Sequence, residues 1–199
     1  MQQRDKEVDK PLIVISIRNI ISALGLDVND QHLIGTPERV ARMYMELCYG
    51  LTADAGRRVD ELFKSVFASE NREMVIFRPI RSFSMCPHHL LPVEYTSYAG
   101  YIANGKVIGM SKIPRLFKLL SARPVIQEDL TQQVGKILME KLQPKGVMVV
   151  MHGRHSCMRC RGVHEDGVVV TTSYVDGIFR DTTERAREEF LSLSGAMQF

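Results

Sequence analysis

Two short clusters of cysteine and histidine are the clearest candidates for chemistry in this sequence. The first, "SMCPHHLLP" (84–92), contains a Cys-x-x-His pair, and the second, "HSCMRC" (155–160), contains His-x-Cys-x-x-Cys. Thiolate and imidazole are ligands that Zn²⁺ prefers, and a gap of two residues lets one tight turn direct both side chains at one ion. The sequence therefore predicts a metal site shared by the two clusters. Its candidate ligands are Cys86, His89, His155, Cys157 and Cys160.

Two kinds of metal site fit these residues. A closed, structural zinc site would use Cys86, His89, Cys157 and Cys160. An open site would use three ligands and leave a fourth position for water, whose pKa the metal lowers to about 7. The neighbouring His88 and His155 favour the open, catalytic site, because imidazoles exchange protons near neutral pH. A thioredoxin-like use of the two spaced cysteines is less favoured, because they follow a β-rich stretch instead of opening a helix after a first strand.

The length and composition are typical of a globular protein with one principal domain. It has 199 residues, 45% hydrophobic and 25% charged, with a net charge of +3. This charge and the lack of a basic stripe argue against nucleic-acid binding. No apolar run is long enough to span a membrane, and "MQQRDKEVDK" lacks the order of a secretory signal, so we expect a cytoplasmic protein that binds no membrane. Four cysteines are too few for a disulfide framework.

The elements that must position the two clusters can be read from periodicity. Apolar spacing predicts helices over 13–24 and 36–50, the second capped by Thr36 with Pro37 in its first turn, and a short third helix over 57–67. From Met74 onward the composition is β-type. The predicted strands cover 74–80, 93–102, 106–110, 146–152 and 167–174, with helices over 111–121 and 126–143 between them and a closing helix after 181. Asn104-Gly105 predicts a hairpin between the second and third strands.

This order predicts an α+β fold, because strands joined in hairpins return after a pair of helices. The expected pattern is ββααββ with a largely antiparallel sheet. We expect an N-terminal helical extension over 1–70 and a catalytic domain over 71–199. Each metal-binding cluster follows a predicted strand, so strand ends that meet at one edge of the sheet would bring the clusters together.

Five motifs, in one order over nearly the whole chain, carry a resemblance to a known family. They are "GTPERVARMY" (35–44), "CPHH" (86–89), "VIGMSKIPRL" (107–116), "RPVIQEDLTQQV" (123–134) and "HSCMRCRG" (155–162). The chain resembles GTP cyclohydrolase I, a zinc-dependent hydrolase acting on cyclic amidine C–N bonds. The resemblance implies conversion of GTP to 7,8-dihydroneopterin triphosphate and formate, the first step of tetrahydrofolate and pterin biosynthesis. It also implies a tunnelling fold (T-fold) and a homodecamer with active sites at subunit boundaries.

The resemblance also assigns roles to individual residues. It implies that Cys86, His89 and Cys157 bind Zn²⁺, and that His88, His155 and Ser111 act in catalysis. Gln127 and Glu128 match the pair that recognises guanine, whose N1–H and 2-amino group one carboxylate can accept together. The triphosphate contacts would be Arg39, Arg42, Lys112, Arg115 and Arg161. Without the resemblance, the two α-helical arginines of 36–50 would be assigned to solvent, and Ser111 to a helix cap.

Two positions depart from the family pattern and keep other functions open. Pro87 stands where the family commonly has glutamate, and Cys160 is an extra thiol beside the site. One alternative is therefore a T-fold protein whose structural zinc is closed by Cys160. Another is a related purine or pterin enzyme that forms a different product.

Overall fold

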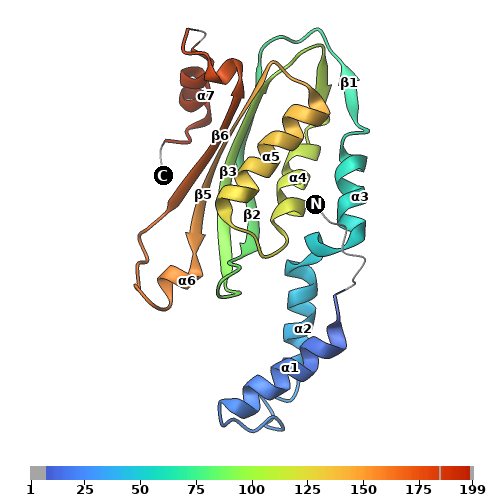
Figure 1. Cartoon of the computed structure of the whole chain (residues 1–199), viewed down its shortest axis with the longest axis vertical. Coiled ribbons are helices and arrows are strands. Elements are labelled where there is room, and N and C mark those ends of the chain that lie inside the picture. The colour runs from blue at the N-terminus through green and yellow to red at the C-terminus, as the bar shows by residue number, and fades with distance from the viewer. Residues whose placement is uncertain (1–7, 184, 198–199) are drawn as a thin grey trace.

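A four-stranded antiparallel sheet forms the centre of the molecule (Figure 1). The computed structural model describes residues 8–183 and 185–197. The sheet has the order β2-β3-β5-β6. Its strands are β2 (Met74–Met85), β3 (Pro92–Ile102), β5 (Gly146–His155) and β6 (Val170–Gly177).

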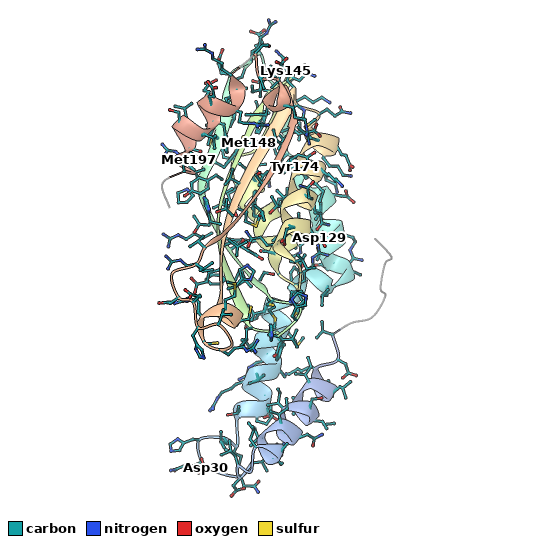
Figure 2. The ribbon with its side chains drawn as sticks, turned by 60° about the vertical axis from the view of Figure 1, so that its left-hand side comes forward. Asp30, Asp129, Lys145, Met148, Tyr174 and Met197 are labelled. Carbon is teal, nitrogen blue, oxygen red and sulfur yellow. The ribbon has the colours of Figure 1, made fainter. Side chains whose placement is uncertain are left out.

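Helices cover both faces of this sheet. On one face, α4 (Lys112–Ser121) and α5 (Gln127–Leu142) build the larger core, and on the other face α7 (Ala186–Ser194) builds a smaller one. The central strand β5 is apolar on both faces because both are covered. Met148 packs on the α7 side and Tyr174 of β6 on the α5 side (Figure 2).

Helices also fill the N-terminal region. The helices α1 (Lys10–Ala23) and α2 (Thr36–Leu47) extend beyond one end of the sheet, and the short helix η1 (Tyr49–Leu51) and α3 (Ala53–Leu62) lead back to it (Figure 1). Much of the apolar surface of α1 is exposed, including Leu12, Ile15 and Ile20, as is Leu24 directly after it. The division into an extension over 1–70 and a catalytic domain over 71–199 stays a prediction.

The structure confirms the predicted α+β class and the ββααββ order, which here is β2-β3, α4-α5 and β5-β6. The predicted hairpin at Asn104-Gly105 is wrong. The strand β4 (Lys106–Ile108) pairs with β1 (Val66–Ala68), because β2 and β5 already occupy both edges of β3. The third predicted helix, over 57–67, is corrected as well. The helix α3 ends at Leu62, because the chain enters β1 at Val66.

The start of α2 differs from the prediction in a smaller way. Thr36 is the first helical residue, and Gly35 holds the capping position. Pro37 lies in the first turn of α2, as predicted, where its missing N–H costs no hydrogen bond. Among the described residues, no helix combines the length and apolar character needed to cross a bilayer.

Candidate metal centre

The register of the sheet brings the two cysteine and histidine clusters to the same end of the strands. Both β2 and β5 run antiparallel to β3, so their C-terminal ends lie at the same end of the sheet, beside the start of β3. There Met85 pairs with Pro92, and Val93 pairs with His155. The predicted meeting of strand ends is thus confirmed.

A tight turn after β2 presents the first cluster. The Leu90 amide donates to the Cys86 carbonyl and the Cys86 amide donates to the Leu91 carbonyl, both at 2.8 Å. Leu90 adopts a left-handed conformation with φ +53°, which closes the turn. As a result Cys86 and His89 point to the same side, with 3.8 Å between Cys86 Sγ and His89 Nδ1.

The second cluster lies on the short helix α6 (Ser156–Arg159), directly after β5. Its cysteine motif therefore does open a helix, contrary to the sequence interpretation, but this helix has one turn and follows β5. Cys157 joins Cys86 and His89 in a group whose ligand atoms all lie within 4.8 Å of one another.

The donor set and its spacing fit a metal such as zinc. Two thiol sulfurs and one imidazole nitrogen are ligands that Zn²⁺ prefers. Sulfur and nitrogen ligands of one tetrahedral zinc are about 3.6 Å apart, close to the 3.8 Å between Cys86 Sγ and His89 Nδ1. Cys160 lies outside the group, because its exposed thiol donates to the Ser156 carbonyl at 3.0 Å. The arrangement favours three ligands over the closed four-ligand site.

His155 is held in place by Gln127, the first residue of α5. Its Nε2 lies 2.9 Å from Gln127 Oε1. The Gln127 amide nitrogen contacts three acceptors, the carbonyls of Met151 and Val170 and the hydroxyl of Thr172, at 2.9 to 3.1 Å. Gln127 is only 2% exposed, so its side-chain amide depends on these protein partners for its hydrogen bonds.

The loop before α5 brings Gln127 to the metal-binding edge. The Val125 amide donates to the Met85 carbonyl, and the Ser84 hydroxyl donates to the Arg123 carbonyl. These bonds fix the start of α5 against the end of β2. Glu128, the next residue, lines the same small cavity as the three ligand residues, His88 and His155, which has a volume of about 270 Å³.

Two residues that the sequence analysis missed complete the surroundings of His155. An added Cβ on Gly153 would lie 2.1 Å from Gln127 Oε1, so only glycine allows Gln127 to approach β5. The Tyr95 ring packs edge-to-face against His155, with 6.4 Å between ring centroids. A glycine inside an otherwise apolar strand is a recognisable signal of such a close approach.

Burial shapes the protonation of the site. Desolvation lowers the pKa of His155, and the nearby Glu128 carboxylate partly opposes this shift. Burial also raises the pKa of the Cys157 thiol, an effect that Cys86 strengthens. A positive metal ion would favour both thiolates.

The other residues implied by the resemblance lie in three places. Arg161 Nη1 is 2.7 Å from His89 Nε2, at the edge of the metal group. Lys112 and Arg115 line a separate cavity beside α3, and Ser111 precedes them at the start of α4 without making a side-chain cap. Arg39 and Arg42 lie exposed on α2. One chain therefore brings Gln127, Glu128 and Arg161 close to the metal group, but not the other four cations.

Comparisons with known proteins show which family this chain is similar to. A model of the family described as GTP cyclohydrolase I matches residues 13–195. The GTP cyclohydrolase 1 of Carboxydothermus hydrogenoformans is 42% identical over 189 residues, covering 94% of this chain and 96% of that protein. The GTP cyclohydrolase 1 of Bacillus subtilis is 40% identical over 187 residues, which cover 94% of this chain and 96% of that protein. A solved structure of an archaeosine synthase QueF-Like, 19% identical, covers 52% of this chain with a TM-score of 0.43.

Proposed function

The chain belongs to the GTP cyclohydrolase I family, and from that premise we propose that it hydrolyses GTP to 7,8-dihydroneopterin triphosphate and formate. The proposal is carried by one observation, the convergence of Cys86, His89 and Cys157 beside a buried, anchored histidine. The overall reaction consumes one water and releases one carbon of the guanine ring as formate. It needs acids, bases and an electrophile, but no redox cofactor.

We propose Zn²⁺ as the metal, held by Cys86, His89 and Cys157. With three protein ligands, zinc supplies a Lewis acid that lowers the pKa of water to about 7. His89 Nδ1 faces Cys86 Sγ at 3.8 Å, as ligation through Nδ1 requires. Arg161 Nη1, a donor, lies 2.7 Å from His89 Nε2, and metal binding at Nδ1 would move the ring proton to Nε2 and displace this contact.

His155 is the proposed proton donor to the opening imidazole ring of guanine. Its Nε2–H is committed to Gln127, which leaves Nδ1 to accept and release protons. His88 lies at the mouth of the same cavity, with its Nδ1 3.8 Å from Cys86 Sγ, and is the proposed second acid or base. Glu128 is exposed in this cavity and is free to accept the guanine N1–H and amino group.

We propose that subunits of a homodecamer complete the active site. Lys112, Arg115, Arg39 and Arg42 lie away from the metal cavity of their own chain, and a neighbouring chain would bring them to it. The edge strands β2 and β6 and the exposed apolar residues of α1 offer surfaces for such contacts.

We place the enzyme in the cytoplasm. All four cysteines are free thiols, and two of them are proposed metal ligands that must stay reduced. We also propose that residues 71–199 form the catalytic T-fold domain and residues 1–70 its helical extension.

Mass spectrometry of the products tests the function. Zinc-loaded protein should convert GTP into a triphosphate with one carbon and one oxygen fewer, and should leave ATP unchanged, because ATP lacks the N1–H and 2-amino group that Glu128 would bind. Release of guanosine phosphates without loss of carbon would reject the proposal and indicate a simple phosphatase.

A further inference from the structure

A second cavity, formed by η1, α3 and α4, has a volume of about 720 Å³ and a strongly cationic lining. The charged residues around it are Arg58, Lys112, Arg115, Lys118, Asp54 and Glu61. Four cations thus face two carboxylates. Within the described part of the chain, Lys112, Arg115 and Lys118 have no ion-pair partner. Such a concentration of unpaired cations favours an anionic ligand.

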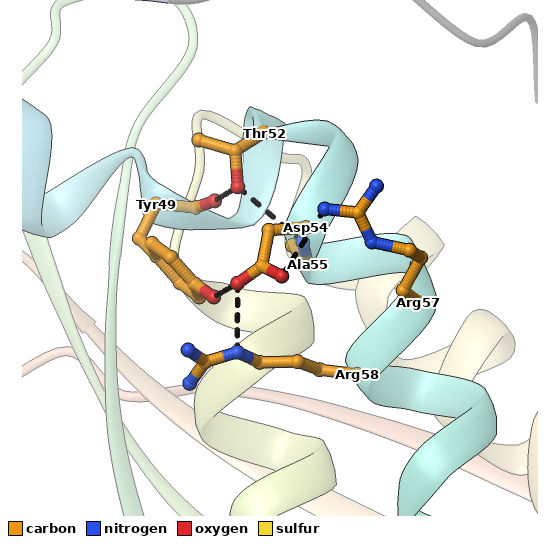
Figure 3. Close-up of polar contacts among 6 residues, drawn as sticks. All are labelled: Tyr49, Thr52, Asp54, Ala55, Arg57 and Arg58. Carbon is orange, nitrogen blue, oxygen red and sulfur yellow. Dashed lines mark hydrogen bonds and ion pairs between the residues drawn. The ribbon is translucent and has the colours of Figure 1, made fainter.

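Arg58 differs from the other three cations because its side chain is fixed. Its Nε donates to Asp54 Oδ2 at 2.8 Å, and its guanidinium lies over the Tyr49 ring, 5.2 Å from the centroid (Figure 3). The Tyr49 hydroxyl donates to the same carboxylate oxygen of Asp54. Both terminal nitrogens of Arg58 have no hydrogen-bond partner in the described residues, so a planar fork of donors remains available.

The contacts around Arg58 fix the position of its side chain and contribute little to the stability of the fold. The Tyr49 hydroxyl and the two arginines lower the pKa of the Asp54 carboxyl, with the Tyr49 hydrogen bond as the first cause, so Asp54 is a carboxylate at neutral pH. Ion pairs between exposed side chains four residues apart on a helix contribute little to folding. Arg57 also pairs with Asp54, at 3.4 Å, but it does not line the cavity. In the view of Figure 3 its guanidinium lies on the other side of Asp54 from that of Arg58.

We propose that Arg58 is a further residue of the phosphate-binding site that the family resemblance assigns to Lys112 and Arg115, and that Asp54 and Tyr49 are its positioning residues. The inference rests on the proposed function for the identity of the nucleotide. Arg58 lies in one cavity with Lys112 and Arg115, which the family resemblance assigns to the triphosphate. A guanidinium held by its Nε can present both terminal nitrogens to phosphate oxygens without first losing rotamer freedom.

The test is the binding of inorganic tripolyphosphate by calorimetry to the assembled wild-type protein and to four variants. Loss of one charge-assisted contact should weaken binding of Arg58→Gln by about tenfold. Arg58→Lys should recover only part of that loss, because lysine lacks the fork. Asp54→Asn, which leaves Arg58 unanchored, should fall between wild type and Arg58→Gln. The matched control Arg57→Gln removes the same charge outside the cavity and should stay within about twofold of wild type.

Steady-state kinetics with GTP separate this inference from the proposed function. Arg58→Gln should raise KM about tenfold with little change in kcat, and its melting temperature should match that of Arg57→Gln. Equal tripolyphosphate affinity of Arg58→Gln and wild type, or equal weakening in the Arg57→Gln control, would overturn the inference. Wild-type protein that binds tripolyphosphate but yields no formate would instead reject the function and leave the anion site standing.

Discussion

Gln127 Oε1 accepts a hydrogen bond from His155 Nε2 at 2.9 Å, and this contact fixes which nitrogen of the histidine can act. The amide nitrogen of Gln127 faces three acceptors, so the carbonyl oxygen must be the atom that faces His155. The Nε2 atom therefore carries a proton, and Nδ1 is the exchanging nitrogen. The side chain assigned by resemblance to guanine recognition is, in this structure, fully used in orienting His155.

Replacing Gln127 should thus damage turnover more than substrate binding. In Gln127→Ala we expect kcat to fall roughly 10- to 100-fold, part of the gain that a positioned acid supplies, with KM changed by less than about threefold. Steady-state kinetics with GTP, beside a zinc assay showing that the metal is retained, measure this. A large rise in KM at constant kcat would show that Gln127 recognises the base.

Gly153 should be as sensitive as Gln127, although it can contact no substrate through a side chain. The added methyl group in Gly153→Ala would lie 2.1 Å from Gln127 Oε1 and 2.9 Å from the Tyr95 ring. We expect a melting temperature lower by about 2–10 °C and a loss of kcat similar to that of Gln127→Ala.

The matched control is Gly56→Ala, in the interior of α3, where an added methyl group meets nothing within 4 Å. It should raise the melting temperature by about 1–4 °C and leave kcat unchanged, because alanine is the better helix former. If both alanine variants keep wild-type kcat, Gly153 has no role in positioning Gln127.

The cysteine pair on α6 provides a comparison between a metal ligand and its neighbour. Cys157→Ser should lose bound zinc and formate release together, because serine replaces a soft thiolate ligand. Cys160→Ser, three residues away, should keep one zinc per chain and wild-type turnover. Metal analysis of the purified variants decides between them, and loss of zinc from Cys160→Ser would restore the closed four-ligand site.

Mixing inactive subunits should restore activity if the site is shared between chains. His155→Ala removes the proposed acid, and Lys112→Ala removes a cation from the distant cavity. A co-expressed equal mixture should recover about a quarter of wild-type activity, since random assembly gives that share of boundaries two intact halves. Separately expressed proteins provide the baseline, and a mixture no more active than its components would place the whole site within one chain.

The metal group could be predicted because its signals are local. The spacing of Cys86 and His89 fits one turn, and each cluster directly follows a strand whose apolar run is visible in the sequence. The ββααββ order needed only the periodicity of apolar residues.

The remaining features depend on tertiary register. Gln127 meets His155 only because the loop before α5 bonds to the end of β2 and because Gly153 leaves room. The pairing of β1 with β4 could not be read from the Asn-Gly turn, since the competition for the edges of β3 is set by the whole sheet. Arg58 was missed because an Asp-to-Arg pair at helical spacing is also typical of a solvent-exposed helix.

The central claim is that an open metal site with an anchored histidine carries GTP through ring opening to the pterin. The most direct measurement is the release of formate from GTP by purified, zinc-loaded protein, followed together with the absorbance of a dihydropterin. We predict that both products appear in equal amounts. Formate without the dihydropterin would indicate a related enzyme that stops at ring opening, and neither product despite bound zinc would contradict the catalytic role of the site.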